Sequence, residues 1–427
     1  MPHTPQTAVV RLLQRLTEAR NIRPGERVAL SAKAAVVPAH LLDRALALPA
    51  VSQKPPTAWH WFHNQNLPAA TPAAAQARAT VMASAGAAGL KDGVAAAGHE
   101  YLHLFEQGKL LPGEVCMGLS PEVHLAGGLA ALGLRLTLGD LAHAGPTGSL
   151  EFTVPQTLRV NLTGKAPAGL GGFDLFWAIA RECGLDSLCG HALEMGGEGL
   201  REISLARRLA MAEFAAHAGL AAIYVQPDAL LVSEINKRLG EGGTLRGYET
   251  VTAEAGAEYA QTRSLDLARV QPSVCIAHDP ASLGTVGERA GARIDRVILA
   301  GTACSVESLR LAANRLKGKT VACTLDVVPA TPRDFSLALA EGLISTLVEC
   351  GARIHPPGLG SALLQDGPQC QTWLTTLAYP PQTAGEVLLC SPAVAAVSAL
   401  AGSLTHPDAP VLLPPRDSKL STRHKPS

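Results

Sequence analysis

The sequence predicts an α/β protein made of three-layer α/β/α domains with parallel or mixed sheets. Beyond residue 270, short apolar segments such as 296–300 and 320–328 alternate with stretches of helical length. Continuously apolar strands between helices are typical of a parallel sheet that is covered on both faces. Earlier in the chain, residues 151–164 alternate between apolar and polar side chains and are rich in β-branched residues, which predicts strands.

The remaining elements follow from local signals. Residues 27–30 and 110–117 each contain or follow a Pro-Gly turn and are predicted to include a short strand. Glycines at 184 and 219 end two of the predicted helices, because glycine readily adopts the left-handed conformation found at helix C-termini. Helices are predicted at 69–89, 123–134, 174–183, 205–218, 305–316 and 333–350, a strand at 352–354, and a glycine-rich loop at 240–247.

The chain has 427 residues, of which 47% are hydrophobic, enough for two or three α/β domains with their own cores. We predict two interwoven α/β domains in residues 1–270 and a third domain in residues 271–406. Residues 407–427 are rich in proline and charged side chains and are predicted to form a flexible tail.

Charge and cysteine usage exclude several classes of protein. The chain has 36 Lys plus Arg and 36 Asp plus Glu, so no basic excess indicates nucleic acid or an anionic membrane as a partner. Nine cysteines without a C-x-x-C pair are typical of reduced, buried thiols. The N-terminal 20 residues predict an amphipathic helix rather than a signal peptide, and no run reaches roughly 18 apolar residues. We therefore expect a cytoplasmic protein.

Five segments carry a family resemblance in an ordered set. They are FTVPQTLRVNLTGK at 152–165, LEMGG at 193–197, ISLARR at 203–208, LAGTACS at 299–305 followed by ESLRLAA at 307–313, and SPAVAAVSALAG at 391–402. Together they resemble the large subunit of 3-isopropylmalate dehydratase and its aconitase relatives, over residues 20–407. The resemblance implies an aconitase-like fold. The family's active site is completed by a small swivelling domain, so the resemblance leaves two cases open: a separate small-subunit partner that carries this domain, or a chain that never needs one.

The resemblance fails where the family holds its iron–sulfur cluster. The family places three cysteines in the segments G-S-C-T-N and P-G-C-G-x-C, because soft thiolate ligands hold such clusters. In this chain Ala303 stands at the first position, with Cys304 one residue later, and Leu359 and Ala362 stand at the other two. We therefore expect no four-iron four-sulfur cluster and no other cofactor.

Other family segments that carry chemistry have changed too. G-D-S-H-T reads GLSPE at 118–122, D-H-N-V-P reads NQNLP at 64–68, a histidine is replaced by Tyr101, and the arginine-bearing N-R-N-F-x-G-R reads TLAYPP at 376–381. The family's arginines resemble clamps for substrate carboxylates, a task for which the guanidinium is well suited. Their loss argues against a citrate-like or isopropylmalate-like substrate.

Glu213 and His217 are the first candidates for catalysis. They lie four residues apart on a predicted helix, so both project from one face and can act as a general base with its orienting carboxylate. A surface ion pair is the alternative. Tyr101 and Glu122 replace residues of the family's pocket and are further catalytic candidates.

Cys304 is a possible nucleophile. The helix predicted to follow it, with Ser305 as N-cap, would lower the thiol pKa and stabilise a bound anion. A buried, inert thiol is the alternative. The residues predicted to contact substrate are Ser305, Arg208, Ser120 and His103.

Two histidine pairs have spacings that can suit a metal such as zinc, namely His99 with His103 and His60 with His63. Neither pair belongs to a full ligand set with recognised spacing, and ordinary polar surface is the alternative. We therefore predict no metal site.

Two functions remain open at this stage. The first is a cluster-independent, dehydratase-like lyase or isomerase that acts on a small organic acid or related metabolite in a rebuilt cleft, in a setting such as specialised biosynthesis. The second is a non-catalytic binding or scaffold subunit that pairs with a small swivel-domain partner.

Overall fold

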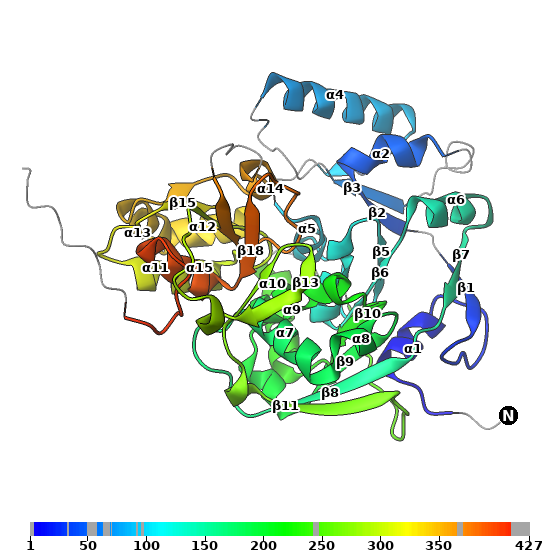
Figure 1. The fold of residues 1–427 in the computed structure, drawn as a ribbon. Coiled ribbons are helices and arrows are strands. Elements are labelled where there is room, and N and C mark those ends of the chain that lie inside the picture. The colour runs from blue at the N-terminus through cyan, green and yellow to red at the C-terminus, as the bar shows by residue number, and fades with distance from the viewer. Residues whose placement is uncertain are drawn as a thin grey trace, which may run out of the picture.

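The computed structural model describes residues 4–31, 34–48, 58–62, 69, 71–90, 93–94, 98–241, 247–364 and 370–410. Within them the protein is a mixed α/β fold with two parallel sheets, one mixed sheet and a two-stranded ribbon (Figure 1). This confirms the predicted α/β class with parallel and mixed sheets. No helix in the described part of the chain is long and apolar enough to cross a membrane.

The first part of the chain forms a parallel five-stranded sheet. Its order is β4 (Gly93–Val94), β3 (Ala58–Phe62), β2 (Ala34–Pro38), β5 (Val115–Gly118) and β6 (Leu132–Arg135). Around it lie α2 (Ala39–Leu46), α4 (Pro72–Ala87), α5 (Glu100–Glu106), the 3-10 helix η1 (Pro121–Leu129) and α6 (Leu138–Thr147). An antiparallel ribbon of β1 (Arg27–Ser31) and β7 (Ser149–Thr153) flanks these elements.

The middle of the chain forms a parallel four-stranded sheet. Its order is β10 (Ala222–Val225), β9 (Ala192–Gly196), β8 (Thr157–Thr163) and β11 (Gln261–Asp266). Its helices are α7 (Gly172–Cys183), α8 (Leu185–Leu188), α9 (Leu205–Glu213), α10 (Ala229–Glu241) and the 3-10 helices η2 (Glu198–Glu202), η3 (Phe214–Ala218) and η4 (Leu267–Arg269).

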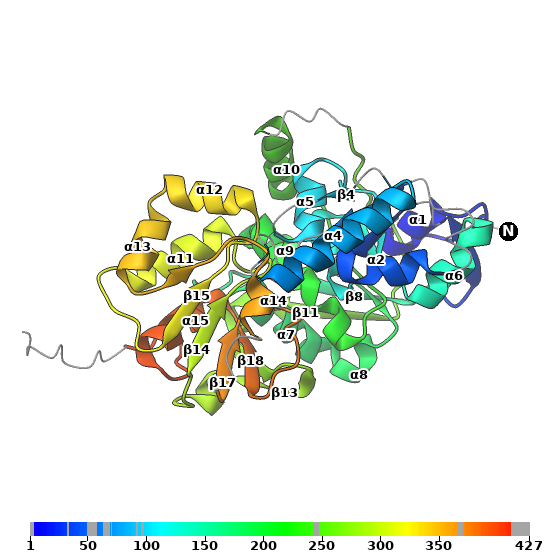
Figure 2. The same cartoon turned by 90° about the horizontal axis from the view of Figure 1, so that it is seen from above.

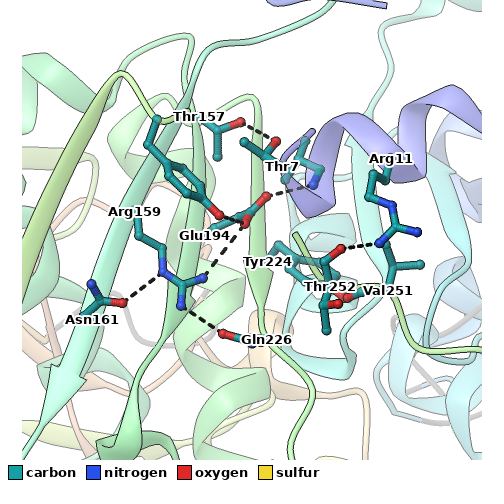
Figure 3. A network of polar contacts seen from close by, with 12 residues as sticks. Thr7, Arg11, Thr157, Arg159, Asn161, Glu194, Tyr224, Gln226, Val251 and Thr252 are labelled. Carbon is teal, nitrogen blue, oxygen red and sulfur yellow. Dashed lines mark hydrogen bonds and ion pairs between the residues drawn. The ribbon is translucent and has the colours of Figure 1, made fainter. Parts of the chain in front are cut away.

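The N-terminal helix α1 (Ala8–Gln14) contacts β9 and β10 of this second sheet, and its buried side chains share a core with the first sheet. Buried Glu194 on β9 accepts hydrogen bonds from the Val9 amide, at 2.8 Å, and from the Tyr259 hydroxyl, at 2.9 Å. Arg159 lies beside it, and its guanidinium donates to Asn161 and Gln226. Figure 3 shows this network joining the helix to the strands. Segments far apart in sequence are therefore interwoven in the first half of the chain.

The last part of the chain forms a mixed seven-stranded sheet. Its order is β13 (Asp279–Thr285), β12 (Ser273–Ile276), β18 (Glu386–Cys390), β17 (Thr372–Thr375), β14 (Arg296–Leu299), β15 (Thr324–Val327) and β16 (Arg353–Ile354). The last five are parallel to one another, while β12 is antiparallel to both of its neighbours, β18 and β13. Its helices are α11 (Val306–Leu316), α12 (Pro332–Ala340), α13 (Leu343–Glu349), α14 (Gly360–Leu363), α15 (Pro392–Ala401) and the 3-10 helix η5 (Gly287–Arg289). Figure 2 shows this part of the molecule beside the other two sheets.

Three predicted helices differ from the structure, one of which, at 205–218, continues beyond Glu213 as the 3-10 helix η3. Residues 123–134 form a 3-10 helix and a strand instead, because η1 packs so closely that a Cβ on Gly127 would lie 2.1 Å from the Ile223 carbonyl oxygen. The predicted helix at 333–350 is two helices, because Gly342 adopts a left-handed φ of 72° between them. The domain boundaries stay predictions, and most of the predicted tail (411–427) and residues 242–246 of the predicted loop lie outside the described residues.

Candidate active site

A cleft of about 370 Å³ lies where strand ends of the five-stranded sheet and the seven-stranded sheet face each other. Ligands of open α/β sheets bind outside the carboxyl ends of parallel strands, and both sheets present those ends here. The five-stranded sheet contributes Pro38 of β2, Ser120 and Glu122 after β5, and Arg135 of β6. The seven-stranded sheet contributes Gly301 after β14, Val328 after β15, Gly358 after β16 and Leu377 after β17.

Contacts of α5 and the two residues before it join the two walls of the cleft, which come from the five-stranded and the seven-stranded sheet. The His99 amide donates to the Ala330 carbonyl, which follows β15, at 3.1 Å. Gly98 has a left-handed φ of 109°, and a Cβ there would lie 2.7 Å from the same oxygen. The Thr331 hydroxyl also donates to Glu106 on α5 at 2.9 Å. A residue larger than glycine at position 98 would therefore push the walls apart.

His99 and Glu213 form a buried ion pair at the edge of the cleft. The His99 Nε2 lies 3.0 Å from Glu213 Oε1, and the side chains are 10% and 3% exposed. Burial alone would lower the pKa of His99, but the hydrogen bond and charge of Glu213, with the charges of Glu100 and Glu122, raise it to about 9. The other ring nitrogen, Nδ1, has no hydrogen-bond partner among the described residues.

Glu122 lines the cleft from the first turn of η1, which follows β5. Burial raises the pKa of its carboxyl group, the charge of Glu100 raises it further and the charge of His99 opposes both, so that it reaches about 7. Its Oε2 atom is buried and has no hydrogen-bond partner within the described part of the chain. A carboxyl group that titrates near neutral pH is suited to general acid–base catalysis.

Ser120 connects Glu100 and Tyr101, which follow His99 in the chain. Its hydroxyl donates to Glu100 Oε1 at 3.2 Å and lies 3.1 Å from the Tyr101 hydroxyl. Tyr101 is fully buried and does not line the cleft, and burial with the charge of Glu100 holds its pKa well above the usual range. Gly118 makes room for it, because a Cβ there would lie 2.2 Å from the tyrosine oxygen. Tyr101 therefore contacts Ser120, which lines the cleft, without lining the cleft itself.

Arg135 is a site residue that the sequence did not reveal. It is the last residue of β6, it is exposed, and it lines the cleft together with Tyr379. Its side chain makes no hydrogen bond or ion pair with another described residue, so the guanidinium is available to a ligand. The signal available in the sequence was its place at the carboxyl end of a parallel strand, which the predicted helix at 123–134 concealed.

Glu213 and His217, predicted as a pair, have different partners. Glu213 binds His99, whereas the His217 Nε2 lies 2.8 Å from the Ala378 carbonyl oxygen. The His217 ring stacks on Tyr379 at 4.5 Å, and burial lowers its pKa. α9 ends at Glu213, and η3 then directs His217 away from the cleft lining. The expected four-residue spacing on one continuous helix is wrong.

The prediction of an activated Cys304 thiol is wrong. Cys304 is 2% exposed in the core under the seven-stranded sheet, and it does not line the cleft. Burial raises its pKa well above the usual range, and the charge of Asp334 adds to this effect. Ser305 does cap α11, accepting a hydrogen bond from the Ser308 amide, but it lies outside the cleft lining. Desolvation therefore outweighs the helix N-terminus here.

Arg208 and His103 also lie away from the cleft lining. Arg208 is fully buried and binds both carboxylate oxygens of Asp228, at 2.9 and 2.6 Å. His103 lies 2.6 Å from the Gln107 side chain, and burial lowers its pKa. No three His, Cys, Asp or Glu side chains gather to hold a metal ion within the described ranges. The second histidine pair cannot be assessed, because His63 lies outside the described residues.

The wall that would hold the family's cluster carries glycines and apolar side chains. Gly301, Gly358 and Gly360 line it, and Ala303, Leu359 and Ala362 stand where the motif resemblance places the family's three cysteines. Cys304 faces the core instead, and no described cysteine lines the cleft. This donor set does not fit a cluster that is held by three thiolates.

The fold and the cleft together define an α/β protein with ionisable side chains in a cleft between two sheets. The aconitase family (aconitate hydratase) matches residues 91–292. The 3-isopropylmalate dehydratase large subunit 1 of Methanopyrus kandleri is 32% identical over 314 residues, which cover 71% of this chain and 74% of the relative. The 3-isopropylmalate dehydratase large subunit of Nitratidesulfovibrio vulgaris is 33% identical over 321 residues, with 73% and 75% covered.

The chain therefore belongs to the aconitase family, which confirms the resemblance drawn from its motifs. Since the relatives are dehydratases by name, the family assignment supports a dehydratase-like enzyme. The crystal structure of Thermococcus kodakaraensis aconitase X in its holo-form has the same fold. It superposes with a TM-score of 0.50 at 12% identity, covering 87% of this chain and 89% of that chain.

Proposed function

We propose that this protein is a dehydratase-like lyase that acts on a small organic acid and does not use an iron–sulfur cluster. The observation that carries the proposal is the pairing of His99 and Glu122 in one cleft. Each has a buried polar atom without a protein partner among the described residues, and their pKa values of about 9 and about 7 suit an acid and a base at neutral pH.

The reaction follows from these protonation states. Glu122 as carboxylate takes a proton from the carbon next to the substrate's carboxylate, and the electrons of that C–H bond form a carbon–carbon double bond. The C–O bond of the neighbouring hydroxyl group breaks, and the His99 imidazolium donates its Nδ1 proton so that water leaves. Glu122 ends protonated and His99 ends neutral, so atoms and charge balance. Returning water to the other carbon would make the same site an isomerase.

The surrounding residues have supporting roles in this proposal. Arg135 holds the substrate carboxylate, where its guanidinium can also stabilise the charge that develops on proton removal. Glu213 keeps His99 protonated and oriented through the 3.0 Å contact with Nε2. Tyr101 and Ser120 position Glu100, which holds the pKa of Glu122 high.

The proposal that no cluster takes part rests on the donor set. Three thiolate positions are occupied by Ala303, Leu359 and Ala362, which have no metal-binding atoms in their side chains. A hydroxyl group leaves with difficulty unless it is protonated or bound to a Lewis acid. The protonated His99 offers the first of these routes.

We also propose a small-subunit partner and a cytoplasmic location. The relatives are named as large subunits, and this chain covers about three quarters of their length. No observation on the described residues favours the alternative of a non-catalytic scaffold, because the cleft retains polar atoms without partners.

Proton exchange tests the proposed chemistry before the natural substrate is known. The full chain, with any co-purifying subunit, is incubated with small hydroxy acids in D2O, and deuterium at the carbon next to the carboxylate is followed by NMR. We expect deuterium exchange in the wild type and none in Glu122→Gln, which lacks the base. In His99→Asn we expect exchange to continue, but without loss of water from the substrate. Exchange that is equally fast in Glu122→Gln would contradict the assigned base.

Metal analysis tests the proposal that the protein uses no iron–sulfur cluster. Iron and acid-labile sulfide are measured in protein that has been purified anaerobically, with a cluster-containing 3-isopropylmalate dehydratase as the positive control. We expect neither element in stoichiometric amount. Stoichiometric iron and sulfide would overturn the cluster-free mechanism.

A further inference from the structure

The charges that line the cleft are unequal in number. Of the described residues that line it, Arg135 is the sole lysine or arginine, whereas Glu100 and Glu122 both contribute carboxyl groups. His99 adds a positive charge, but its Nε2 is already bound to Glu213, so this ion pair carries little net charge outward. Among the described lining residues, the cleft therefore offers one free cationic group, Arg135, to an anionic ligand.

Arg135 is also the group whose geometry suits a carboxylate. A guanidinium binds a carboxylate through two parallel hydrogen bonds, and this one is exposed and has no partner among the described residues. Arg135 lines the same cleft as the carboxyl-bearing residues Glu100 and Glu122. A substrate anchored on Arg135 thus reaches toward the carboxyl groups.

A second carboxylate on the substrate would meet like charges at that end. Glu100 already makes ionisation of Glu122 more difficult, and a substrate carboxylate in the same space would suffer the same repulsion. Apolar side chains of Leu41, Val328 and Leu377 form other parts of the lining. They can cover an alkyl group without leaving a charge unpaired.

We propose that the cleft selects hydroxy acids with a single carboxylate, held by Arg135, and rejects dicarboxylates and tricarboxylates. The remainder of the selected substrate is apolar, neutral or cationic. This inference rests on the proposed function, because it assigns the substrate class of the same site. The resemblance places TLAYPP where the family has its arginine-bearing segment. In this proposal the single Arg135 takes over the binding of the substrate carboxylate.

A matched pair of ligands tests the inference. 3-Hydroxybutyrate and malate have the same number of carbons, and a methyl group of the first replaces a carboxylate of the second. Isothermal titration calorimetry is carried out at pH 8 with both enantiomers of each acid, on the full chain with any co-purifying subunit. We expect 3-hydroxybutyrate to bind at least ~10-fold more tightly than malate, because only malate brings a second charge near Glu100 and Glu122.

Two variants locate the cause of the selectivity. Arg135→Gln is expected to weaken 3-hydroxybutyrate binding at least ~10-fold, while Arg135→Lys keeps part of the affinity, because a point charge replaces the bidentate contact. The double variant Glu100→Gln and Glu122→Gln is expected to bind malate more tightly. The difference in affinity between 3-hydroxybutyrate and malate should therefore become smaller. Unchanged binding in Arg135→Gln overturns the assigned anchor.

The outcomes separate this inference from the proposed function. If malate binds more tightly and undergoes proton exchange that depends on Glu122, the single-carboxylate inference is overturned while the lyase proposal stands. If 3-hydroxybutyrate binds more tightly and Glu122→Gln leaves its proton exchange unchanged, the substrate class stands and the assigned chemistry fails. Binding of neither acid overturns both.

Discussion

Two buried carboxyl groups, Glu194 and Glu122, show how the same residue type can serve opposite purposes. Both oxygens of Glu194 are occupied, one by the Val9 amide and the other by the Tyr259 hydroxyl (Figure 3). Glu122 leaves its Oε2 without a partner among the described residues. Buried polar groups are nearly always hydrogen-bonded, so an unpaired one at a cleft indicates a place for a ligand.

The electrostatic environments of Glu194 and Glu122 differ as well. Burial raises the pKa of Glu194, but hydrogen-bond donors and Arg159 oppose that shift. Burial also raises the pKa of Glu122, and the neighbouring Glu100 adds to the shift. The first group has hydrogen-bond donors on both oxygens and holds α1, whereas the second has an oxygen that is left without a donor and can exchange a proton. The contrast separates a structural network from a site for chemistry, and the following experiments test it.

The largest effect is expected from Glu122→Gln. The amide keeps the size of the side chain but cannot take up a proton, so kcat should fall on the order of 10³-fold. The melting temperature should not fall, because the loss of a buried charge repelled by Glu100 does not weaken packing. A kcat within tenfold of the wild type, measured on an acid found active by proton exchange, would contradict the assigned role.

Glu194→Ala should act on stability instead. Removing the carboxyl group leaves the Val9 amide and the Tyr259 hydroxyl without their acceptor, at a cost of about 3 kcal/mol in the free energy of unfolding. Urea denaturation measures this loss, with Glu194→Gln as the control that retains an acceptor. Activity per folded molecule should be unchanged, and a selective loss of kcat would erase the distinction between the two regions.

The pH profile of the cleft should be bell-shaped. Glu122 must be ionised, so the rate should fall about tenfold per pH unit below about 7, and His99 must be protonated, so the rate should fall above about 9. In Glu122→Gln the residual rate should no longer fall below about pH 7, while the fall above about pH 9 should remain. A profile that is flat from pH 6 to 10 would remove both groups from the mechanism.

The smallest effect is expected from Cys304→Ala. The thiol is buried in the core, and its loss creates a small cavity that costs about 1 kcal/mol of stability. Activity should stay within twofold of the wild type, and thiol-directed alkylation of the folded protein should not reach this residue. Loss of activity greater than tenfold at unchanged stability would restore Cys304 as a candidate nucleophile.

The local parts of the fold could be predicted from the sequence. The strands around residues 151–164, the helix at 174–183 and the alternation after residue 270 follow from apolar periodicity and are present in the structure. The helix at 123–134 was wrong, because close packing of glycines on β10 overrides local helix propensity. Likewise the spacing of Glu213 and His217 indicated a pair that a change to 3-10 geometry prevents.

The sequence by itself determined the α/β class and the family, since both are readable from local pattern and residue identity, and it predicts that the cluster cysteines are replaced. Only the tertiary structure decided which polar residues face one another. The partnership of His99 with Glu213 joins residues 114 positions apart, and Arg135 becomes a site residue because two sheets direct their strand ends at one cleft. Burial and charge at that meeting point, rather than residue type, set the pKa values on which the proposed chemistry depends.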